Sequence, residues 1–434
     1  MNASASAPAA PGRDAVVIGA GLSGLATSVK LAQEGKKVTL ITKGIGGLQL
    51  GQGTIDVIGY TPDRVTAPLD ALAGLPATHP YTAIGGAPAV EPALKWLADT
   101  VGPDFLVGDG TRNYILPTAV GALRPTALPQ PSMVAGEPRG AGQKFVIVGL
   151  RRLKDFYSKL VAENLAKQNA ADGSRIEARA VELDFEIRPG EQDTSGVNHA
   201  RALDDPEVRR RFIVAVRALI QPGETVGLPA VLGLNDYPAA WKEIQEGLGT
   251  DVFEIPLPPP SVPGMRLNQK LTHLARDLGV RIILGSRAVG FEADGDKVTG
   301  VEYSSAGHHT VAKAREFVLA NGGFESGALE MDSHMVVRET LFDLPLAGTE
   351  GQMTHADFWG DPQPLYEAGV VVDGEMRPVT PGGDAGAPGA PVYQNLRAVG
   401  GLLAGCTRWR EKSGDGIALA SAFQAANAIL GGDR

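Results

Sequence analysis

A glycine-rich turn near the start of the chain, set between a strand and a helix, most constrains the fold. Residues 14–18 predict a short buried strand, and Gly19, Gly21 and Gly24 follow it in the pattern G-x-G-x-x-G. Apolar residues at helical spacing predict a helix directly after the turn, and residues 38–42 predict a second parallel strand. The segment therefore predicts a βαβ unit that binds a nucleotide.

Each glycine of this turn has its own role in such a unit. The first permits a tight turn, the second lets the backbone approach a pyrophosphate, and the third lets the helix pack closely on the strand. The N-terminus of the helix then presents free N–H groups and a positive dipole end to the phosphates. The predicted cofactor contacts of the turn are Gly19, Gly21, Leu22, Ser23 and Gly24.

The acidic residue that usually ends the second strand of such a unit is missing. Its place is taken by Thr42, which Lys43 follows. A carboxylate at this position would accept hydrogen bonds from the ribose of an adenosine. We expect Thr42 and Lys43 to lie beside the cofactor. Lys43 either meets a phosphate or is a solvated lysine at a strand end.

Composition narrows the class of protein. The 434 residues include 40 basic and 49 acidic ones, so the net charge of −9 argues against a general binder of nucleic acid backbones. A single cysteine, Cys406, excludes an intrachain disulfide, a Cys-ligated cluster and a zinc knuckle, and we predict no metal site. No apolar run is long enough to span a membrane. Residues 1–11 lack the features of a secretory signal and predict a disordered extension.

Two further glycine turns indicate a flavoprotein. Residues 317–323 predict a buried strand that runs into a turn, after hairpin strands at 297–303 and 310–315. Residues 395–401 predict a strand that ends in glycine, and an Ala-rich helix follows Ser413 and extends to about Leu430. The N-terminus of that helix would stabilise negative charge on a reduced flavin. The predicted contacts are Asn321, Gly322, Gly323, Gly400, Gly401, Gly414, Asp415, Gly416 and Ile417.

The chain resembles the B subunits of the anaerobic, quinone-linked glycerol-3-phosphate dehydrogenases. It is more distantly similar to the flavin subunits of fumarate reductase and succinate dehydrogenase. The resemblance covers nearly the whole chain after the first dozen residues. The segments that carry it are residues 53–57, 79–81, 121–126, 146–150, 155–156, 198–204, 232–234 and 257–267.

The resemblance implies an activity and an assembly. Enzymes of this family oxidise sn-glycerol 3-phosphate to dihydroxyacetone phosphate and pass the electrons to a quinone. The B subunit is described with FMN, beside an FAD-bearing A subunit and an iron–sulfur C subunit at the membrane. This places the chain in the cytoplasm, held at the inner face of the membrane through a partner. The absent ribose carboxylate suits FMN, our first choice, whereas the intact G-x-G-x-x-G suits FAD, the alternative.

A second glycine-rich stretch follows the βαβ unit. Gly51, Gln52 and Gly53 resemble the loop that approaches the isoalloxazine in fumarate-reductase-like flavoproteins. The alternative is a flexible surface loop. Some relatives carry a histidine here for covalent attachment of the flavin, whereas this chain has Thr42, Lys43 and Gly44. The resemblance therefore implies a non-covalent cofactor.

The expected architecture is α/β: a Rossmann-like FAD/NAD(P)-binding flavoprotein domain with an inserted α/β lobe. The flavin domain is assigned to residues 12–85, 263–330 and 385–434. Residues 86–262 form the inserted substrate or partner lobe, and residues 331–384 form a smaller excursion near the active face. Within the lobe, residues 201–220 predict one amphipathic helix. The run Arg209–Arg211 on that helix is interpreted as a solvated face.

Oxidation of an alcohol by a flavin requires a base for the hydroxyl proton and, for this substrate, cations for the phosphate. The candidate bases are His199, His334 and His355. An arginine fork matches phosphate oxygens, and Arg124 and Arg266 are the first candidates because they lie in glycine- and proline-rich segments that carry the resemblance. Arg338 and Arg408 follow them. Each of these residues is otherwise a structural histidine or part of an ordinary ion pair.

Two alternative functions stay open at the level of sequence. In one, the chain carries a flavin but only relays electrons or braces the catalytic subunit. In the other, it is a soluble flavin reductase that acts on an unsaturated acid or a ketone, as in fumarate reductases. The absence of a clear acid–base constellation favours the first alternative.

Overall fold

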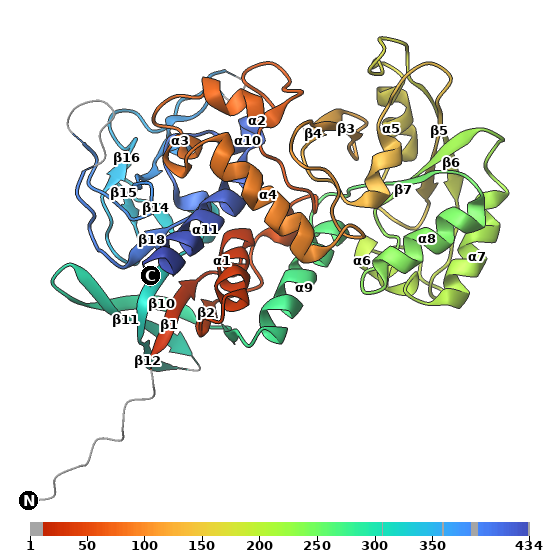
Figure 1. The fold of residues 1–434 in the computed structure, drawn as a ribbon. Coiled ribbons are helices and arrows are strands. Elements are labelled where there is room, and N and C mark those ends of the chain that lie inside the picture. The colour runs from red at the N-terminus through yellow and green to blue at the C-terminus, as the bar shows by residue number, and fades with distance from the viewer. Residues whose placement is uncertain (1–11, 306, 358–359, 383–388, 433–434) are drawn as a thin grey trace, which may run out of the picture.

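A computed structural model describes residues 12–305, 307–357, 360–382 and 389–432. The predicted disordered extension, residues 1–11, lies outside these ranges. The described chain has two hydrophobic cores, one around the N-terminal βαβ unit and one in the segment 123–262. Figure 1 shows them as two lobes, with α9 (Val262–Asp277) leading from the smaller lobe back to the larger.

The larger lobe is built on a five-stranded parallel sheet in the order β18-β13-β1-β2-β9. Its strands are β1 (Arg13–Ile18), β2 (Val38–Thr42), β9 (Arg281–Leu284), β13 (Ala314–Leu319) and β18 (Leu396–Ala398). Ile18 of β1 pairs with Leu319 of β13 and with Ile41 of β2, so the neighbouring strands end level with one another. Their carboxyl ends therefore form one edge, where α/β sheets of this type bind ligands.

Helices pack around this sheet and form the first hydrophobic core with it. Helix α1 (Leu22–Gln33) packs against α11 (Gly414–Gly431), and α11 in turn packs against α4 (Ala87–Val101), as Figure 1 shows. Helix α4 belongs to this core, although residue 86 was the expected start of the inserted lobe. The predicted domain limits stay predictions. Short helices lie at α2 (Pro68–Ala71), α3 (Pro80–Ile84) and α10 (Arg408–Glu411).

Short antiparallel strand pairs accompany the parallel sheets. One sheet is formed by β10 (Arg287–Asp294), β11 (Lys297–Ser305) and β12 (His308–Ala312). The smaller pairs are β3 (Tyr114–Pro117) with β4 (Leu123–Thr126), β14 (Leu329–Met331) with β15 (Val337–Glu339), and β16 (Leu346–Ala347) with β17 (Gly369–Val370). The predicted hairpin strand 310–315 is divided between β12 and β13, because Ala314 already pairs with Arg13 in the parallel sheet.

The smaller lobe has its own parallel sheet in the order β6-β5-β7-β8. The strands are β5 (Lys144–Leu150), β6 (Glu177–Leu183), β7 (Glu224–Pro229) and β8 (Val252–Ile255). Around it lie α5 (Ser158–Leu165), α6 (Gly196–Ala202), α7 (Pro206–Arg217) and α8 (Tyr237–Leu248). Both lobes are therefore α/β units with parallel sheets, as the sequence predicted.

The prediction of one charged, solvated helix at residues 201–220 is wrong in two respects. The segment is two helices, because Pro206 opens α7 and Asp205 caps it by accepting a hydrogen bond from the backbone N–H of Glu207. Arg210 and Arg211 are exposed, as predicted for a solvated face, but Arg209 is not. It is 4% exposed, and its Nε donates to Glu243 at 2.6 Å. The carboxylate on the neighbouring helix explains how a cation is buried there.

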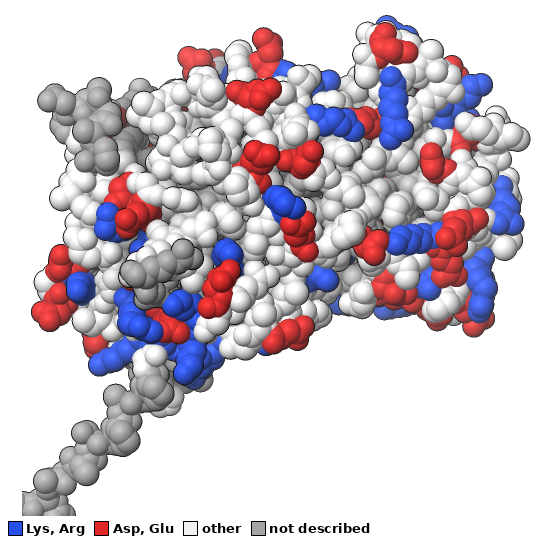
Figure 2. Space-filling view, in the orientation of Figure 1, with Lys and Arg blue, Asp and Glu red and all other residues white. Residues whose placement is uncertain are grey.

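The surface carries both signs of charge. Figure 2 shows acidic and basic side chains interspersed over most of the visible face, with a group of basic ones beside the start of β1. On this face the acidic excess of the chain is therefore not gathered in one place. None of the helices in the described ranges is long and apolar enough to cross a membrane.

Candidate functional site

A cavity of about 1130 Å³ opens at the carboxyl edge of the five-stranded sheet. Its wall comes from the turns that follow β1, β2, β9 and β13, from the loop 44–56, and from the start of α11. Drug-sized ligands occupy sites of roughly 300–1,000 Å³, so there is room for a dinucleotide. The distant segments predicted to hold a cofactor therefore line one cavity.

The G-x-G-x-x-G turn has the spacing that a pyrophosphate requires. A Cβ atom on Gly19 would lie 2.2 Å from the carbonyl oxygen of Ala320, and one on Gly24 would lie 1.9 Å from that of Gly19. Both positions exclude a side chain. Gly21 differs, because no atom lies within 4 Å of its Cβ position and it faces the cavity as the N-cap of α1. Leu22 and Ser23 begin the helix at the cavity wall. This arrangement fits a phosphate group at the helix N-terminus.

The cavity continues past the phosphate position toward the end of β2. Thr42 and Lys43 line it there, together with Ser286, Arg287 and Ala288. The Thr42 hydroxyl donates to the carbonyl oxygen of Gly44 at 2.6 Å, and Lys43 is exposed. In dinucleotide-binding folds the adenosine occupies this end. The cavity thus fits FAD, whose adenosine would otherwise have no place.

The loop 44–53 is tethered rather than free. The carbonyl of Ile45 accepts a hydrogen bond from the Asn268 side chain at 2.7 Å, and that of Gln49 accepts one from the N–H of Ser261 at 2.8 Å. Gly51 and Gly53 line the cavity, whereas Gln52 faces a smaller adjoining pocket. The start of α9 therefore holds this loop against the cofactor cavity.

The remaining predicted cofactor residues divide into two groups. Asn321, Gly322, Gly401, Gly414 and Asp415 line the cavity. The second group is placed just behind the wall: Gly24, Gly323, Gly400, Gly416 and Ile417. In that group, the N–H of Gly416 donates to the carbonyl oxygen of Asp56 at 2.9 Å. This bond fixes the first turn of α11 so that Asp415 lies at the cavity.

A cationic cluster lies at the α11 end of the cavity. Arg124 on β4 forms an ion pair with Asp56 and donates to the side-chain oxygen of Gln52. Asp56 is 3% exposed and also accepts a hydrogen bond from the Thr54 hydroxyl at 3.2 Å. Arg124 still lines the cavity, so its guanidinium is held in place while it faces the ligand space. Of the two first-ranked arginines, this one reaches the candidate site.

Lys412 and Asp415 line the same end of the cavity as Arg124. Burial lowers the pKa of Lys412, and the nearby charge of Arg124 lowers it further. Burial raises the pKa of Asp415 to about 6, and Arg124 opposes this rise. Lys412 has a left-handed backbone conformation with φ of 54°, which is unusual for a residue with a side chain. The turn before α11 thus holds a cation at the cavity in a conformation that favours glycine.

Arg408 and Trp409 of α10 border the same end. Both line the cavity, and Arg408 donates to the carbonyl oxygen of Leu403 at 3.2 Å. The Trp409 side chain is 53% exposed and contacts the ring of Tyr366 edge-on. Three cations, Arg124, Lys412 and Arg408, therefore converge on one end of the cavity. An anionic ligand would be attracted to that end.

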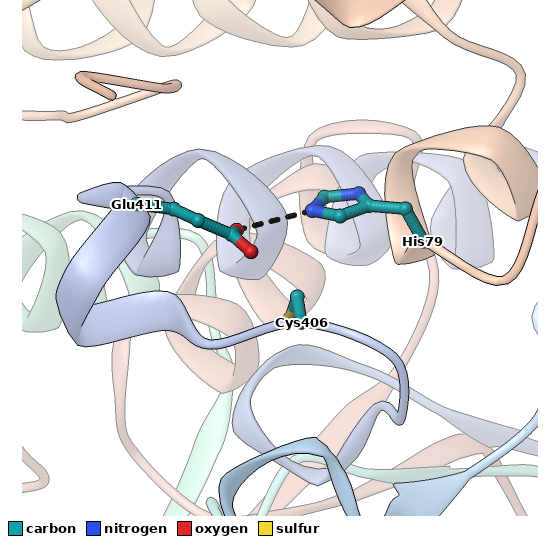
Figure 3. A group of neighbouring side chains, drawn as sticks. All are labelled: His79, Cys406 and Glu411. Carbon is teal, nitrogen blue, oxygen red and sulfur yellow. Dashed lines mark hydrogen bonds and ion pairs between the residues drawn. The ribbon is translucent and has the colours of Figure 1, made fainter. Parts of the chain in front are cut away.

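Behind this wall, His79, Cys406 and Glu411 point toward one another (Figure 3). His79 Nε2 lies 3.1 Å from Glu411, and His79 Nδ1 accepts a hydrogen bond from the N–H of Tyr81 at 3.2 Å. A metal-bound histidine normally donates its second ring N–H, whereas here that nitrogen is an acceptor. Burial raises the pKa of Cys406 to about 12, which keeps the thiol protonated. The geometry is that of a hydrogen-bonded brace, not of metal ligands.

The brace supports the segment that carries Arg408 and Lys412. Burial acts to raise the pKa of Glu411, but hydrogen bonds from His79, Ser413 and the N–H of Thr407 outweigh it and lower the pKa. The backbone carbonyl of Glu411 also accepts from the N–H of Gly59 at 2.7 Å. Glu411 therefore stays ionised and ties α10 to the loops beneath it.

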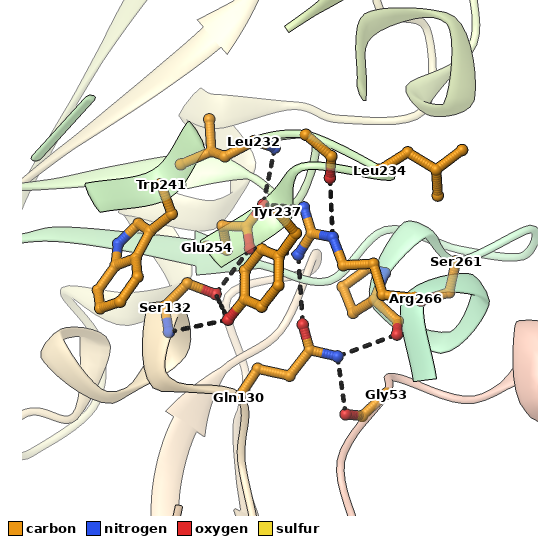
Figure 4. A network of polar contacts seen from close by, with 12 residues as sticks. Gly53, Gln130, Ser132, Leu232, Leu234, Tyr237, Trp241, Glu254, Ser261 and Arg266 are labelled. Carbon is orange, nitrogen blue, oxygen red and sulfur yellow. Dashed lines mark hydrogen bonds and ion pairs between the residues drawn. The ribbon is translucent and has the colours of Figure 1, made fainter. Parts of the chain in front are cut away.

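Arg266 lies elsewhere, in the interior between the two lobes (Figure 4). Its side chain is 1% exposed and binds both oxygens of Glu254, at 2.7 and 2.9 Å. Its Nε donates to the carbonyl of Gly233 at 2.8 Å, and its guanidinium stacks over Tyr237 at 4.0 Å. Gln130 connects this pair to the carbonyl of Gly53 at 3.1 Å. The Arg266 guanidinium has no free edge for a substrate phosphate.

The three candidate histidines also lie away from the cavity wall. His199 is fully buried in α6, and burial lowers its pKa. His334 is exposed at the turn between β14 and β15. His355 is half-buried, and its Nδ1 contacts Gln363 at 3.2 Å. Arg338 is exposed on β15, where it pairs with Glu330 at 3.3 Å.

Sequence reasoning missed Asp56 and Lys412 and assigned Asp415 only to the cofactor. Asp56 lies within a segment, 53–57, that carries the family resemblance, so its acidic character was visible. Lys412 precedes the Gly414–Gly416 turn, where a cation next to a helix start offered a second signal. Neither pattern predicts that both residues meet Arg124, which comes from another part of the chain.

The chain is similar in sequence to known proteins along most of its length. Residues 14–417 match the family model described as an FAD binding domain. A protein of Pectobacterium atrosepticum, named as the B subunit of anaerobic glycerol-3-phosphate dehydrogenase, is 32% identical over 436 residues, which cover 96% of this chain and 98% of that protein. The chain belongs to this B-subunit family.

A Halobacterium salinarum protein, named as the probable B subunit of anaerobic glycerol-3-phosphate dehydrogenase, is 30% identical, and the match covers 96% of this chain and 97% of that protein. The 3-ketosteroid delta1-dehydrogenase of Sterolibacterium denitrificans overlaps 98% of this chain and 100% of its own at 11% identity, with a TM-score of 0.43. That overlap is too weak to add to the assignment, which depends on the sequences.

The family match identifies the chain as a flavoprotein oxidoreductase with a flavin dehydrogenase role. The description of the matched domain favours FAD. The expectation of FMN as the first choice is therefore not supported. The absence of a carboxylate that could bind the adenosine ribose did not indicate FMN in this chain. The reason is visible in the cavity, which extends to Thr42 and Lys43 without needing a carboxylate there.

Proposed function

We propose that the chain binds FAD non-covalently and oxidises sn-glycerol 3-phosphate to dihydroxyacetone phosphate. The observation that carries this proposal is the single cavity with two dissimilar ends. One end has the pyrophosphate turn at Gly21, and the other has the cations Arg124, Lys412 and Arg408. The names of the B-subunit relatives supply the substrate, whose phosphate matches the cationic end.

The described residues at the cavity wall can hold FAD without a covalent bond. None of them is a histidine or a cysteine, the residue types that would provide an attachment point. The Gly19–Ser23 turn would hold the pyrophosphate, and the loop 44–53 together with the start of α11 would border the flavin ring. Bound FAD supplies the two-electron oxidant for a carbon–hydrogen bond.

The protein's own residues would bind and orient the substrate. Arg124 is held by Asp56 and Gln52, so its position is preorganised and costs little to order on binding. Lys412 and Arg408 add charge on the α11 side, where a phosphate dianion would offset the repulsion between the cations. The carbon chain of the substrate would then lie beside the flavin ring, which would border the same start of α11.

The finer assembly is part of the same proposal. The electrons would leave through a partner, because the single cysteine provides no internal cluster chain. We propose the FAD-bearing A subunit and the iron–sulfur C subunit of the same dehydrogenase as partners, and a quinone as the final acceptor. The chain would then be cytoplasmic and peripheral to the inner face of the membrane through those partners.

The test is the visible spectrum of the purified full-length chain before and after anaerobic addition of sn-glycerol 3-phosphate. We expect a flavin band that bleaches, and acid treatment should release FAD into the supernatant. A band that persists would contradict catalysis by this chain and favour the relay or bracing role. Oxidation of the reduced flavin by fumarate would instead favour the reductase alternative.

A further inference from the structure

We propose that Asp415 accepts the hydroxyl proton of the substrate as the alcohol is oxidised. This inference rests on the proposed function. The O–H bond breaks and its proton moves to a carboxylate oxygen of Asp415. The carbon-bound hydrogen leaves with its electron pair to the FAD oxidant, and the carbon–oxygen double bond of the ketone forms.

The placement of Asp415 supports this role. It lies in the first turn of α11, and the bond from Gly416 N–H to the Asp56 carbonyl oxygen fixes that turn. Asp415 lines the cavity with Arg124 and Lys412. A carboxylate beside the cations expected to bind the phosphate end would lie within a few atoms of the neighbouring hydroxyl group of a small substrate.

Other acidic groups of the cavity are less suited to this role. Asp56 is 3% exposed and is occupied by Arg124 and Thr54. Glu325 and Glu330 also line the cavity, but both are exposed to solvent near β14. Since the three histidines lie away from the wall, Asp415 is the enclosed carboxylate in reach of the cationic end among the described residues.

The electrostatic surroundings match the task. Burial raises the pKa of Asp415 to about 6, while Arg124 keeps it from rising further. Near neutral pH the group is therefore ionised, yet it is a stronger base than an ordinary aspartate. Rates should rise with pH through about 6 and then level off. Arg124 and Tyr81 interact electrostatically with Asp415, and the other charged groups that line this end of the cavity are Asp56, Lys412 and Arg408.

The experiment compares D415N, D415E and the wild type as full-length, flavin-loaded chains. The rate of flavin reduction by sn-glycerol 3-phosphate is followed anaerobically by stopped flow between pH 5 and pH 9. General bases contribute about 10²–10⁴-fold to a rate, so D415N should lose at least about 100-fold and also lose the rise near pH 6. D415E should recover part of the rate. D99N, on the exposed face of α4, is the matched control and should behave as the wild type.

A second readout does not depend on turnover. Addition of dihydroxyacetone phosphate to the oxidised chain should perturb the flavin absorbance of the wild type and of D415N with similar midpoints. In the absence of ligand, the wild-type absorbance should shift with pH near 6, and this shift should be absent from D415N. If Asp415 had only a structural role, D415N would show the same pH-dependent change in flavin absorbance as the wild type.

The outcomes separate the two proposals. If the wild type is not reduced by sn-glycerol 3-phosphate, both fail. If the wild type is reduced and D415N keeps its rate and pH profile, only the inference about Asp415 is overturned. If K412M, and not D415N, removes the pH-dependent rise, Lys412 is the base and Asp415 is not.

Discussion

Arg124 and Arg266 had the same expected role, and the fold gives them opposite surroundings. Arg124 is held by Asp56 and Gln52 yet keeps a face toward the cavity. Arg266 is enclosed, and its guanidinium is engaged by Glu254, Gln130 and a backbone carbonyl. One arginine is therefore available to a ligand, and the other joins two lobes.

The role of an arginine therefore depends more on the partners that the fold gives it than on its local sequence. Both residues lie in glycine- and proline-rich segments that carry the family resemblance. A buried ion pair is weak evidence for net stability, but it strictly requires both partners. A cation at a cavity wall, such as Arg124, instead contributes mainly to ligand binding. Removing each arginine should therefore have different consequences.

The largest effect is expected from Arg266→Met. The Glu254 side chain is 0% exposed, and loss of its counter-charge would leave a buried carboxylate unpaired. We expect the free energy of unfolding to fall by about 3–5 kcal/mol. Denaturation in urea followed by circular dichroism measures this loss. The double variant R266M/E254Q should recover much of it, and a loss below about 1 kcal/mol for the single variant would contradict an interior structural role.

Arg124→Lys should impair activity more than folding. Lysine keeps the charge but cannot bond to Asp56 and Gln52 in the two directions of the guanidinium fork. We expect kcat/KM for sn-glycerol 3-phosphate to fall by about 10- to 100-fold. The matched control is Arg338→Lys, whose side chain is 69% exposed on β15. Equal losses in both variants would remove the distinction between the cavity and the surface.

The smallest effect is a gain of stability in the ligand-free chain on Asp415→Asn. The folded-state pKa is about 6, against an ordinary value of 3.8, so the folded state binds more protons between these values. Wild-type stability therefore falls as pH rises through this range. D415N should be more stable than the wild type above pH 6, by about 1–2 kcal/mol, with the gap closing toward pH 4. Thermal melts across pH measure it.

Neutralising Glu254 and neutralising Asp415 should change the free energy of unfolding in opposite directions. Removing the charge of Glu254 alone should destabilise the chain, because Arg266 would lose its counter-charge. Removing the charge of Asp415 should stabilise it, because that charge is retained at a cost in the folded state. If both substitutions lowered stability equally, the Asp415 end of the cavity would be another structural pair.

The local elements were largely predictable. Residues 38–42 form β2 and residues 144–150 form β5, because apolar runs bounded by turns are a sequence-level signal. The break between α6 and α7 was missed, although Pro206 indicated it. The meeting of Asp56, Arg124, Lys412 and Asp415 was not predictable, since these residues are up to hundreds of positions apart and share no period.

The nucleotide turn could be recognised from the sequence, because its glycines follow a fixed pattern. Backbone contacts with Ala320 and with Gly19 exclude a side chain at Gly19 and Gly24, and Gly21 leaves the cavity side open. The sequence also determined the family, through segments spread along the chain. Which cations face the cavity, which histidines do not, and where Asp415 lies could not be read from the sequence. These properties depend on burial and on partners brought together by chain folding, and the free energy of a charged group is set by those surroundings rather than by its neighbours in sequence.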